Sequence, residues 1–147
     1  VLGASGCGSG EPADVAASAK VVTPSTTQAA VPPLPSVADV TVLARRLLDP
    51  NVPNAEKAGM FQGAAADPEL PNRIASLAAQ NGVAMGEVTD VASTPTGMIA
   101  SGTWSINGGP PQPISVNFVA EDGAWKVEKA WGCQLIEAFG IRSPACP

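Results

Sequence analysis

The clearest alternation of hydrophobic and polar positions lies between residues 112 and 140. Every second side chain of residues 114–118 is large and apolar, which is the period of a strand with one face on a core. The acidic turn at residues 121–123 ends in glycine, and the alternation resumes at residues 125–127, so the pattern predicts a β-hairpin. The apolar residues then change to helical spacing, which predicts a closing helix over residues 134–139.

Helical spacing also marks the first part of the folded region. Apolar side chains recur through residues 37–48, and Ser36 with Asp39 resembles a capping box at their start. A second helix is expected between residues 67 and 82. The segment between these helices is broken by proline and glycine, which predicts a loop with one helical turn around residues 56–61.

Two further strands are predicted before the hairpin. Residues 98–106 alternate cleanly, whereas residues 83–91 change phase near Gly86, which predicts a β-bulge there. Asn-Gly-Gly at residues 107–109 then favours a turn. The order of elements predicts an α+β fold with two N-terminal helices, a curved four-stranded antiparallel sheet and a C-terminal helix, with the helices on one face of the sheet.

The composition divides the chain into three parts. The sequence of 147 residues is 45% hydrophobic, which is enough for the core of one domain. Residues 8–35 are dominated by Ala, Pro, Ser, Thr and Val and contain no aromatic residue, so they cannot bury enough apolar surface to fold. We interpret residues 7–35 as a disordered tether spanning on the order of 30 Å. Residues 36–147 form the predicted domain, and residues 1–6 are expected to be the remnant of a signal peptide.

Cys7 is a candidate lipidation site. The run Ala-Ser-Gly-Cys at residues 4–7 resembles the end of a bacterial lipoprotein signal, in which two small residues precede a cysteine that carries lipid on its sulfur. The alternative is an unmodified cysteine in a Gly/Ser linker. The hypothesis that Cys7 carries lipid predicts an extracytoplasmic protein, either anchored to the cell membrane or secreted.

Cys133 and Cys146 are predicted to form a disulfide. Disulfides pair cysteines two by two, so one of the three cysteines must remain outside a bond. Cys133 and Cys146 both follow the last predicted strand. The chain is expected to leave the reducing cytosol, so a bond between them could persist. A zinc or redox site is the competing interpretation. It is disfavoured because the spacing matches no CxxC motif and the chain has no histidine.

Composition also argues against several functional classes. With 8 basic and 13 acidic residues the net charge is −5, and no basic cluster exceeds Arg45-Arg46, so we expect no nucleic-acid partner. Histidine is the commonest general base and metal ligand, and its absence favours a noncatalytic protein without cofactor or metal. The remaining candidates for catalysis or metal binding are carboxylates. They are scattered along the chain or adjacent at a hairpin tip: Asp49, Asp67, Glu69, Asp90, Glu121 and Asp122.

Three stretches carry a resemblance to a known family: LLDPNVPNAEKAGMFQGA, PISVNFVAEDGAWKVEKA and CQLIEAFG. They resemble the mycobacterial low-molecular-weight secreted antigens over roughly residues 37–140. The resemblance implies an exported actinobacterial protein with no established enzymatic activity and no catalytic residues to carry over. The order of helices and strands is also similar to the nuclear-transport-factor-two-like or cystatin-like cone, a fold that hosts enzymes and binding proteins alike.

Two functions follow as hypotheses. The first is a lipid-anchored interaction module that binds an envelope protein or another envelope component. The second is a carrier of a small apolar ligand or lipid in the concave face of the sheet, with Trp104, Phe118 and Trp125 lining the cavity. The competing interpretation of these aromatic residues is that they only fill the core.

Overall fold

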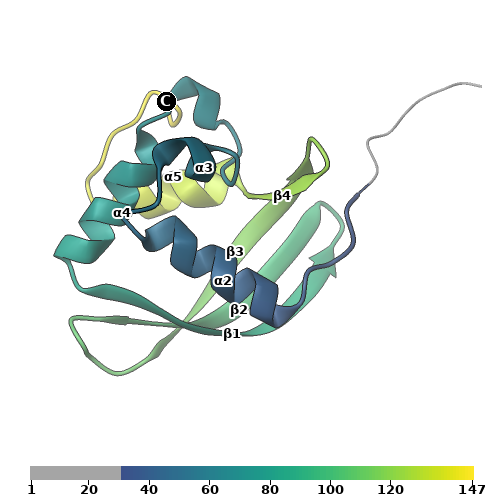
Figure 1. Cartoon of the computed structure of the whole chain (residues 1–147), viewed down its shortest axis with the longest axis horizontal. Helices are drawn as coiled ribbons and strands as arrows, with labels where there is room; N and C mark the ends of the chain where they lie inside the picture. Colours follow the sequence, from purple (N-terminus) through teal and green to yellow (C-terminus); the bar gives the residue numbers. More distant parts are fainter. Residues whose placement is uncertain (1–30) are drawn as a thin grey trace, which may run out of the picture. The chain divides into compact units, whose positions relative to one another are not determined.

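The computed structural model describes residues 31–147, and its helices lie on one side of a four-stranded sheet (Figure 1). The elements are α2 (Val37–Leu48), α3 (Asn54–Ala58), a 3₁₀ turn η1 (Ala64–Ala66), α4 (Leu70–Gln80), β1 (Val83–Thr94), β2 (Gly97–Ile106), β3 (Gln112–Glu121), β4 (Ala124–Val127) and α5 (Lys129–Ala138). The predicted α+β class is confirmed. Cys7 and most of the proposed tether lie outside the described residues.

Helix α2 begins with the predicted capping box. The Ser36 hydroxyl accepts a hydrogen bond from the Asp39 backbone N–H at 3.1 Å, and the Asp39 carboxylate accepts one from the Ser36 N–H at 3.2 Å. Hydrogen bonds from Ser36 also hold the pKa of Asp39 below its usual value. Arg45 and Arg46 lie in the last turn, where the helix dipole favours positive charge.

Three α-helices precede the sheet, one more than the two full helices predicted. The third is α3, which overlaps the single helical turn predicted around residues 56–61 and begins two residues earlier. Lys57 anchors it, because this side chain is fully buried and its ammonium donates to the Asp49 carbonyl and, at 2.9 Å, to the Asn72 side chain. These partners lie on α4 and after α2, so tertiary contacts stabilise a helix too short to form alone.

The closing helix starts earlier than predicted. It runs over Lys129–Ala138 and not over residues 134–139, with Glu128 as its N-cap. The first turn of this helix is not predicted from the sequence because it contains Trp131 and Gly132, and neither residue is a strong helix former. Cys133 therefore lies in the middle of α5.

The sheet is open, antiparallel and ordered β1-β2-β3-β4. The register of β1 against β2 shifts on both sides of Val88, which confirms the bulge predicted near Gly86. This irregularity directs the Val88 backbone N–H to the Thr41 hydroxyl of α2 at 3.1 Å. At the opposite edge, residues 60–62 pair with Val127 of β4. Both edges are thus partly covered by other parts of the domain.

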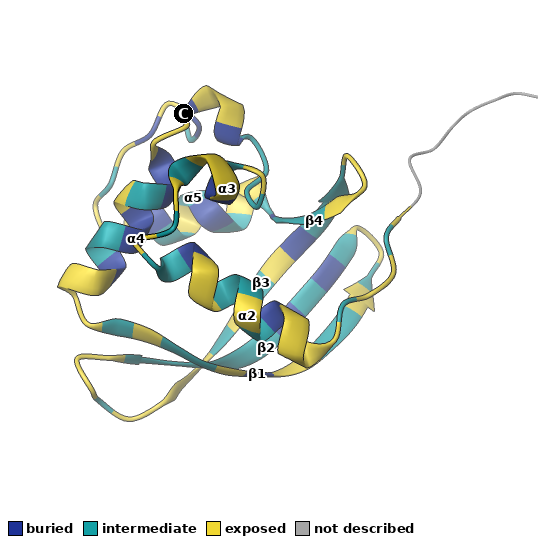
Figure 2. Cartoon of the chain, viewed as in Figure 1, coloured by how far each residue is buried: buried dark blue, intermediate teal, exposed yellow. Residues whose placement is uncertain are grey.

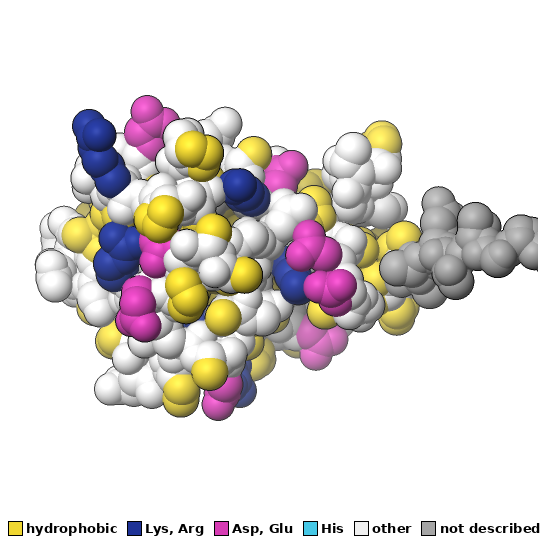
Figure 3. Space-filling model, turned by 90° about the horizontal axis from the view of Figure 1, so that it is seen from above, with side chains coloured by type: hydrophobic (Ala, Val, Ile, Leu, Met, Phe, Trp, Pro, Cys, Tyr) yellow, Lys and Arg dark blue, Asp and Glu magenta, His cyan; other side chains and the backbone are white. Residues whose placement is uncertain are grey.

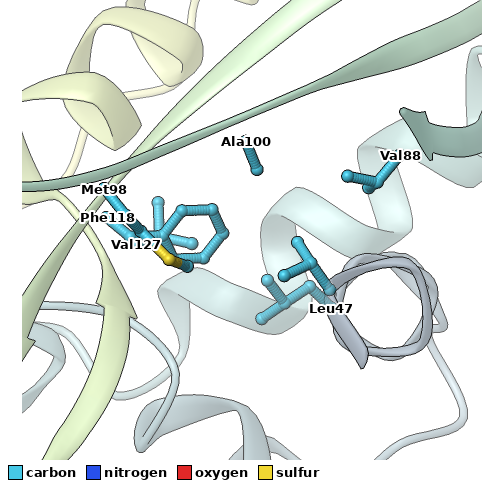
Figure 4. Close-up of a cluster of buried hydrophobic side chains, with 7 residues drawn as sticks. Leu47, Val88, Met98, Ala100, Phe118 and Val127 are labelled. Atoms are coloured by element: carbon cyan, nitrogen blue, oxygen red, sulfur yellow. The ribbon is translucent and has the colours of Figure 1, made fainter. Parts of the chain in front are cut away.

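The buried side chains form two clusters. The sheet cluster joins the inner face of the sheet to α2 (Figure 4), and consists of Val40, Leu47, Val88, Met98, Ala100, Phe118 and Val127. The tail cluster joins α4, α5 and the C-terminal tail, and consists of Leu70, Ile74, Ile136 and Ala145. Figure 2 shows the corresponding buried segments on β2 and β3 and on α4 and α5.

Candidate functional site

The C-terminal tail is covalently attached to α5. Cys133 and Cys146 form the predicted disulfide, with their Cα atoms 5.5 Å apart. The bond joins the middle of the last helix to the penultimate residue of the chain. Both cysteines border a surface groove between α5 and the tail, so the tail forms one wall of this groove.

A buried polar network also fixes the tail. The Ser143 hydroxyl donates to the Asp67 carboxylate at 2.6 Å, and Asp67 also pairs with Arg73. Arg73 donates to the Arg142 carbonyl at 3.1 Å, and the Ala145 N–H donates to the Ser143 hydroxyl at 3.1 Å. From the sequence, Asp67 is only one of several scattered carboxylates. No local signal identifies its role, because Ser143 is 76 residues away.

An apolar cavity of about 90 Å³ lies between the two clusters. The structure places two of the three predicted aromatic residues, Trp104 and Phe118, in its lining, together with residues of α2, α4 and α5. Trp125 does not line it. Trp125 lies on the same face of β4 as Val127, because it pairs with Ala120 whereas Val127 pairs with Phe118, and it packs against the edge of the sheet cluster.

The three tryptophan side chains differ in their hydrogen bonds. The indole N–H of Trp125 donates to the Pro33 carbonyl at 3.0 Å, and that of Trp131 donates to the Ser115 carbonyl at 2.8 Å. The indole N–H of Trp104 donates to no acceptor within residues 31–147. No buried side-chain polar atom in this part of the chain lacks a hydrogen-bond partner.

The outer face of the sheet is not covered by the described helices. Its two central strands carry small or uncharged side chains there: Ile99, Ser101, Thr103, Ser105, Pro113, Ser115, Asn117 and Val119. The hydroxyls of Ser101 and Ser115 lie 3.3 Å apart. The charged groups nearest to this face are Asp90 on β1, Lys126 on β4 and Glu128, whose carboxylate accepts a hydrogen bond from the Asn117 side chain at 3.1 Å. By contrast, the side of the molecule shown in Figure 3 carries basic and acidic groups next to one another.

Two of the carboxylates considered from the sequence, Glu121 and Asp122, lie at the hairpin tip and have a partner there. Lys126 forms ion pairs with Asp122 at 3.1 Å and Glu121 at 3.3 Å. The hydrogen bond to Asp122 is the main reason that the pKa of Lys126 is raised. The turn itself places Asp122 and Gly123 at positive φ, as a two-residue hairpin loop requires. These charges stabilise a turn and do not converge on a cavity.

No three His, Cys, Asp or Glu side chains of residues 31–147 lie close enough together to hold a metal ion. None of the helices in this part of the chain is both long and apolar enough to cross a membrane.

Comparison with known proteins gives one match to a family. The model of the family described as low molecular weight antigen MTB12, C-terminal domain, matches residues 33–143, which are 143 − 33 + 1 = 111 of the 147 residues. No curated protein matches the chain.

Proposed function

The chain belongs to the family of the low molecular weight antigen MTB12 C-terminal domain, and from this premise we propose that it is an exported, lipid-anchored and noncatalytic interaction module of the cell envelope. The family is one of antigens and not a known enzyme family, which favours an extracytoplasmic location. The membrane anchor and the partner are part of the proposal.

The observation that carries the interaction role is the uncharged outer face of the sheet. Exposed protein surfaces normally carry many charged side chains, whereas the cores of protein interfaces are depleted of them. Here the outer faces of β2 and β3 have no charged side chain from residue 97 to residue 119. A partner with a similarly uncharged, hydrogen-bonding surface fits this face, and we assign it to an envelope protein.

Binding to isolated actinobacterial envelopes tests this role. Ser115 is exposed on the outer face, so Ser115→Arg places a charge within the proposed contact. Gln80→Arg is the matched control, because it adds the same charge at an exposed position on α4. We expect Ser115→Arg to reduce retention on envelopes at least about tenfold, as desolvating an unpaired charge does, while Gln80→Arg binds normally.

Two results would contradict the interaction role as stated. Equal retention of both variants excludes the outer face as the contact. Retention that survives protease treatment of the envelopes excludes a protein partner and assigns binding to another envelope component.

Cys7 is the proposed attachment point. The support is the Ala-Ser-Gly-Cys run, and residues 8–35 supply the reach to hold the domain clear of a membrane. A single acyl chain binds membranes only marginally, so stable attachment requires the several chains of a bacterial lipoprotein. We expect the protein to partition into detergent and Cys7→Ala to appear in the medium. Unchanged partitioning of Cys7→Ala would exclude the anchor.

The cavity between the two clusters favours a second candidate function, the binding of a small apolar ligand. Its location between the helices and the inner face of the sheet is where a cone-like fold would hold a ligand. A volume of about 90 Å³ is far below that of a pocket for a large lipid, so only part of such a ligand would be enclosed.

A further inference from the structure

Exposed apolar side chains gather where the described domain begins. Six large apolar side chains are exposed in residues 31–147, and four of them fall within residues 31–42. These four are Val31, Leu34, Val37 and Val42, with exposed fractions of 70%, 45%, 42% and 57%. Single apolar residues scattered over a surface need no explanation, whereas a group of them marks an interaction site. We call residues 31–46 the junction, because the proposed tether meets the domain there.

The first part of the junction is held in one conformation. Every residue from 31 to 35 is a proline or precedes one, which favours the polyproline II conformation. This conformation repeats every three residues, so Val31 and Leu34 lie on the same side of the segment. The Trp125 indole N–H donates to the Pro33 carbonyl at 3.0 Å and thereby fixes the segment to β4. The two exposed side chains are therefore presented by a segment with little conformational freedom.

Helix α2 continues the junction with an apolar and a basic side chain on its outward side. Val40 and Leu47 of this helix pack against the sheet. Val42 is two positions from Val40 and Arg45 is two positions from Leu47, which places each about 200° around the helix from its buried neighbour. Arg45 forms no ion pair with any side chain of residues 31–147.

The other charged side chains of the junction have partners. The Asp39 carboxylate accepts hydrogen bonds from the Ser36 N–H at 3.2 Å and from the Ser36 hydroxyl at 2.8 Å, and Arg46 pairs with Glu56. Arg45 and Arg46 are the only two adjacent basic residues in a sequence whose net charge is −5. Exposed apolar side chains beside arginine are the combination that binds the surface of an anionic bilayer.

We propose that the junction binds the surface of an anionic lipid bilayer, with its exposed apolar side chains at the boundary of head groups and acyl chains and Arg45 against lipid phosphates. This inference rests on the proposed anchor at Cys7, which lies 31 − 7 = 24 residues before Val31. A flexible coil of that length spans about 25–30 Å on average. The tether that can hold the domain clear of the membrane thus also lets it return.

This contact orients the domain on the membrane. Helix α2 packs against the inner face of the sheet, so its outward side points away from the sheet (Figure 1). With that side on the bilayer, the uncharged outer face of the sheet points away from the membrane. The outer face then stays open to the proposed envelope partner.

Flotation with vesicles of phosphatidylglycerol and phosphatidylcholine in equal parts tests the proposal. The full chain is used with Cys7→Ser, so that no acyl group contributes to binding. A short tether supplies an effective concentration on the order of millimolar, so we expect binding within that range of lipid concentration. No binding in that range overturns the proposal, because the anchored protein would not make the contact either.

Two matched pairs of variants locate the contact. Leu34→Ser should weaken binding about five- to tenfold, whereas Ile106→Ser should not, although the two side chains are similarly exposed at 45% and 41%. Arg45→Gln should weaken binding about fivefold at low salt and much less at high salt. Arg142→Gln is its control, because it removes an exposed positive charge from the C-terminal tail. Equal effects within either pair overturn the assigned contact.

Further outcomes separate this proposal from the proposed anchor and from another occupant. If Cys7→Ala is released into the medium but the Cys7→Ser chain binds no vesicles, the bilayer contact is overturned and the anchor stands. If Cys7→Ala partitions unchanged while vesicles bind through Leu34 and Arg45, the anchor is excluded and the contact stands. Dimerisation that Leu34→Ser abolishes, without vesicle binding, assigns the junction to a second copy of the chain and overturns the proposal.

Discussion

Seven buried side chains from α2 and the four strands form the sheet cluster, whereas only four form the tail cluster. The smaller cluster is supplemented by the disulfide of Cys133 with Cys146 and by the polar contacts of Asp67. The first region is stabilised by apolar burial and a continuous hydrogen-bonded ladder. The second adds a covalent bond and charged groups where apolar area is limited.

This difference determines how each region responds to its surroundings. Apolar packing does not depend on redox potential, whereas a disulfide is sensitive to reductant. The region of α4, α5 and residues 139–147 is therefore expected to loosen under conditions that leave the sheet intact. An oxidising extracytoplasmic location suits such a design.

The largest effect is expected in the sheet cluster. Phe118→Ala removes an aromatic side chain that is only 4% exposed, and the loss of burial together with the cavity left behind should cost about 3–5 kcal/mol. Urea unfolding measures this cost. Val119→Ala on the outer face is the control and should cost much less. Similar costs for both would show that the assigned faces of β3 are wrong.

Loss of the disulfide should come next. Replacing Cys133 and Cys146 together by serine releases a closed loop whose ends are 13 residues apart, which is worth about 3 kcal/mol in the chain-entropy model. The melting temperature of the double variant should match that of the reduced protein. A melting temperature equal to that of the oxidised protein would exclude a stabilising role for the bond.

Ser143→Ala should have a smaller effect. It removes one donor to the buried Asp67 carboxylate, but Arg73 remains as a partner, so we expect a cost of about 1–3 kcal/mol. Ser93→Ala, at an exposed position of β1, is the control. In a double-mutant cycle with Asp67→Asn the two losses should not be additive, and strict additivity would contradict a direct interaction.

The smallest effect concerns Lys57 and pH. Burial lowers the pKa of its ammonium, and the Asp49 charge opposes this only partly. The unfolded chain then binds the proton more tightly, so stability should rise with pH between the lowered folded pKa and the ordinary value of 10.5. Lys57→Met should remove this rise, whereas Lys129→Met, at an exposed position, should keep it. Identical alkaline profiles for Lys57→Met and the unmodified protein would exclude Lys57 as the cause.

The features predicted from sequence depend on neighbours in the chain. The Ser36 capping box, the bulge near Gly86 and the Asp122-Gly123 turn each have their signal within a few residues. The disulfide was predictable because its two cysteines are the only pair left once Cys7 is assigned to lipid.

The features missed by sequence analysis depend on distant partners. The sequence predicts one helical turn near α3 but not its anchoring, in which Lys57 reaches acceptors on two other segments, and Asp67 gains its role from Ser143. Likewise, nothing local distinguishes Trp104 from Trp125, since both occupy the inner face of a strand. Only the position of the tail cluster places Trp104 beside the cavity and leaves Trp125 at the other end of the sheet.

Native-state hydrogen exchange with and without reductant most directly tests the division into two regions. After selective reduction of the Cys133–Cys146 bond, we predict faster exchange for amides of α4 and α5 and unchanged protection for the central amides of β2 and β3. Equal acceleration in all four elements would contradict the account, because it would show that the two clusters unfold only as one unit.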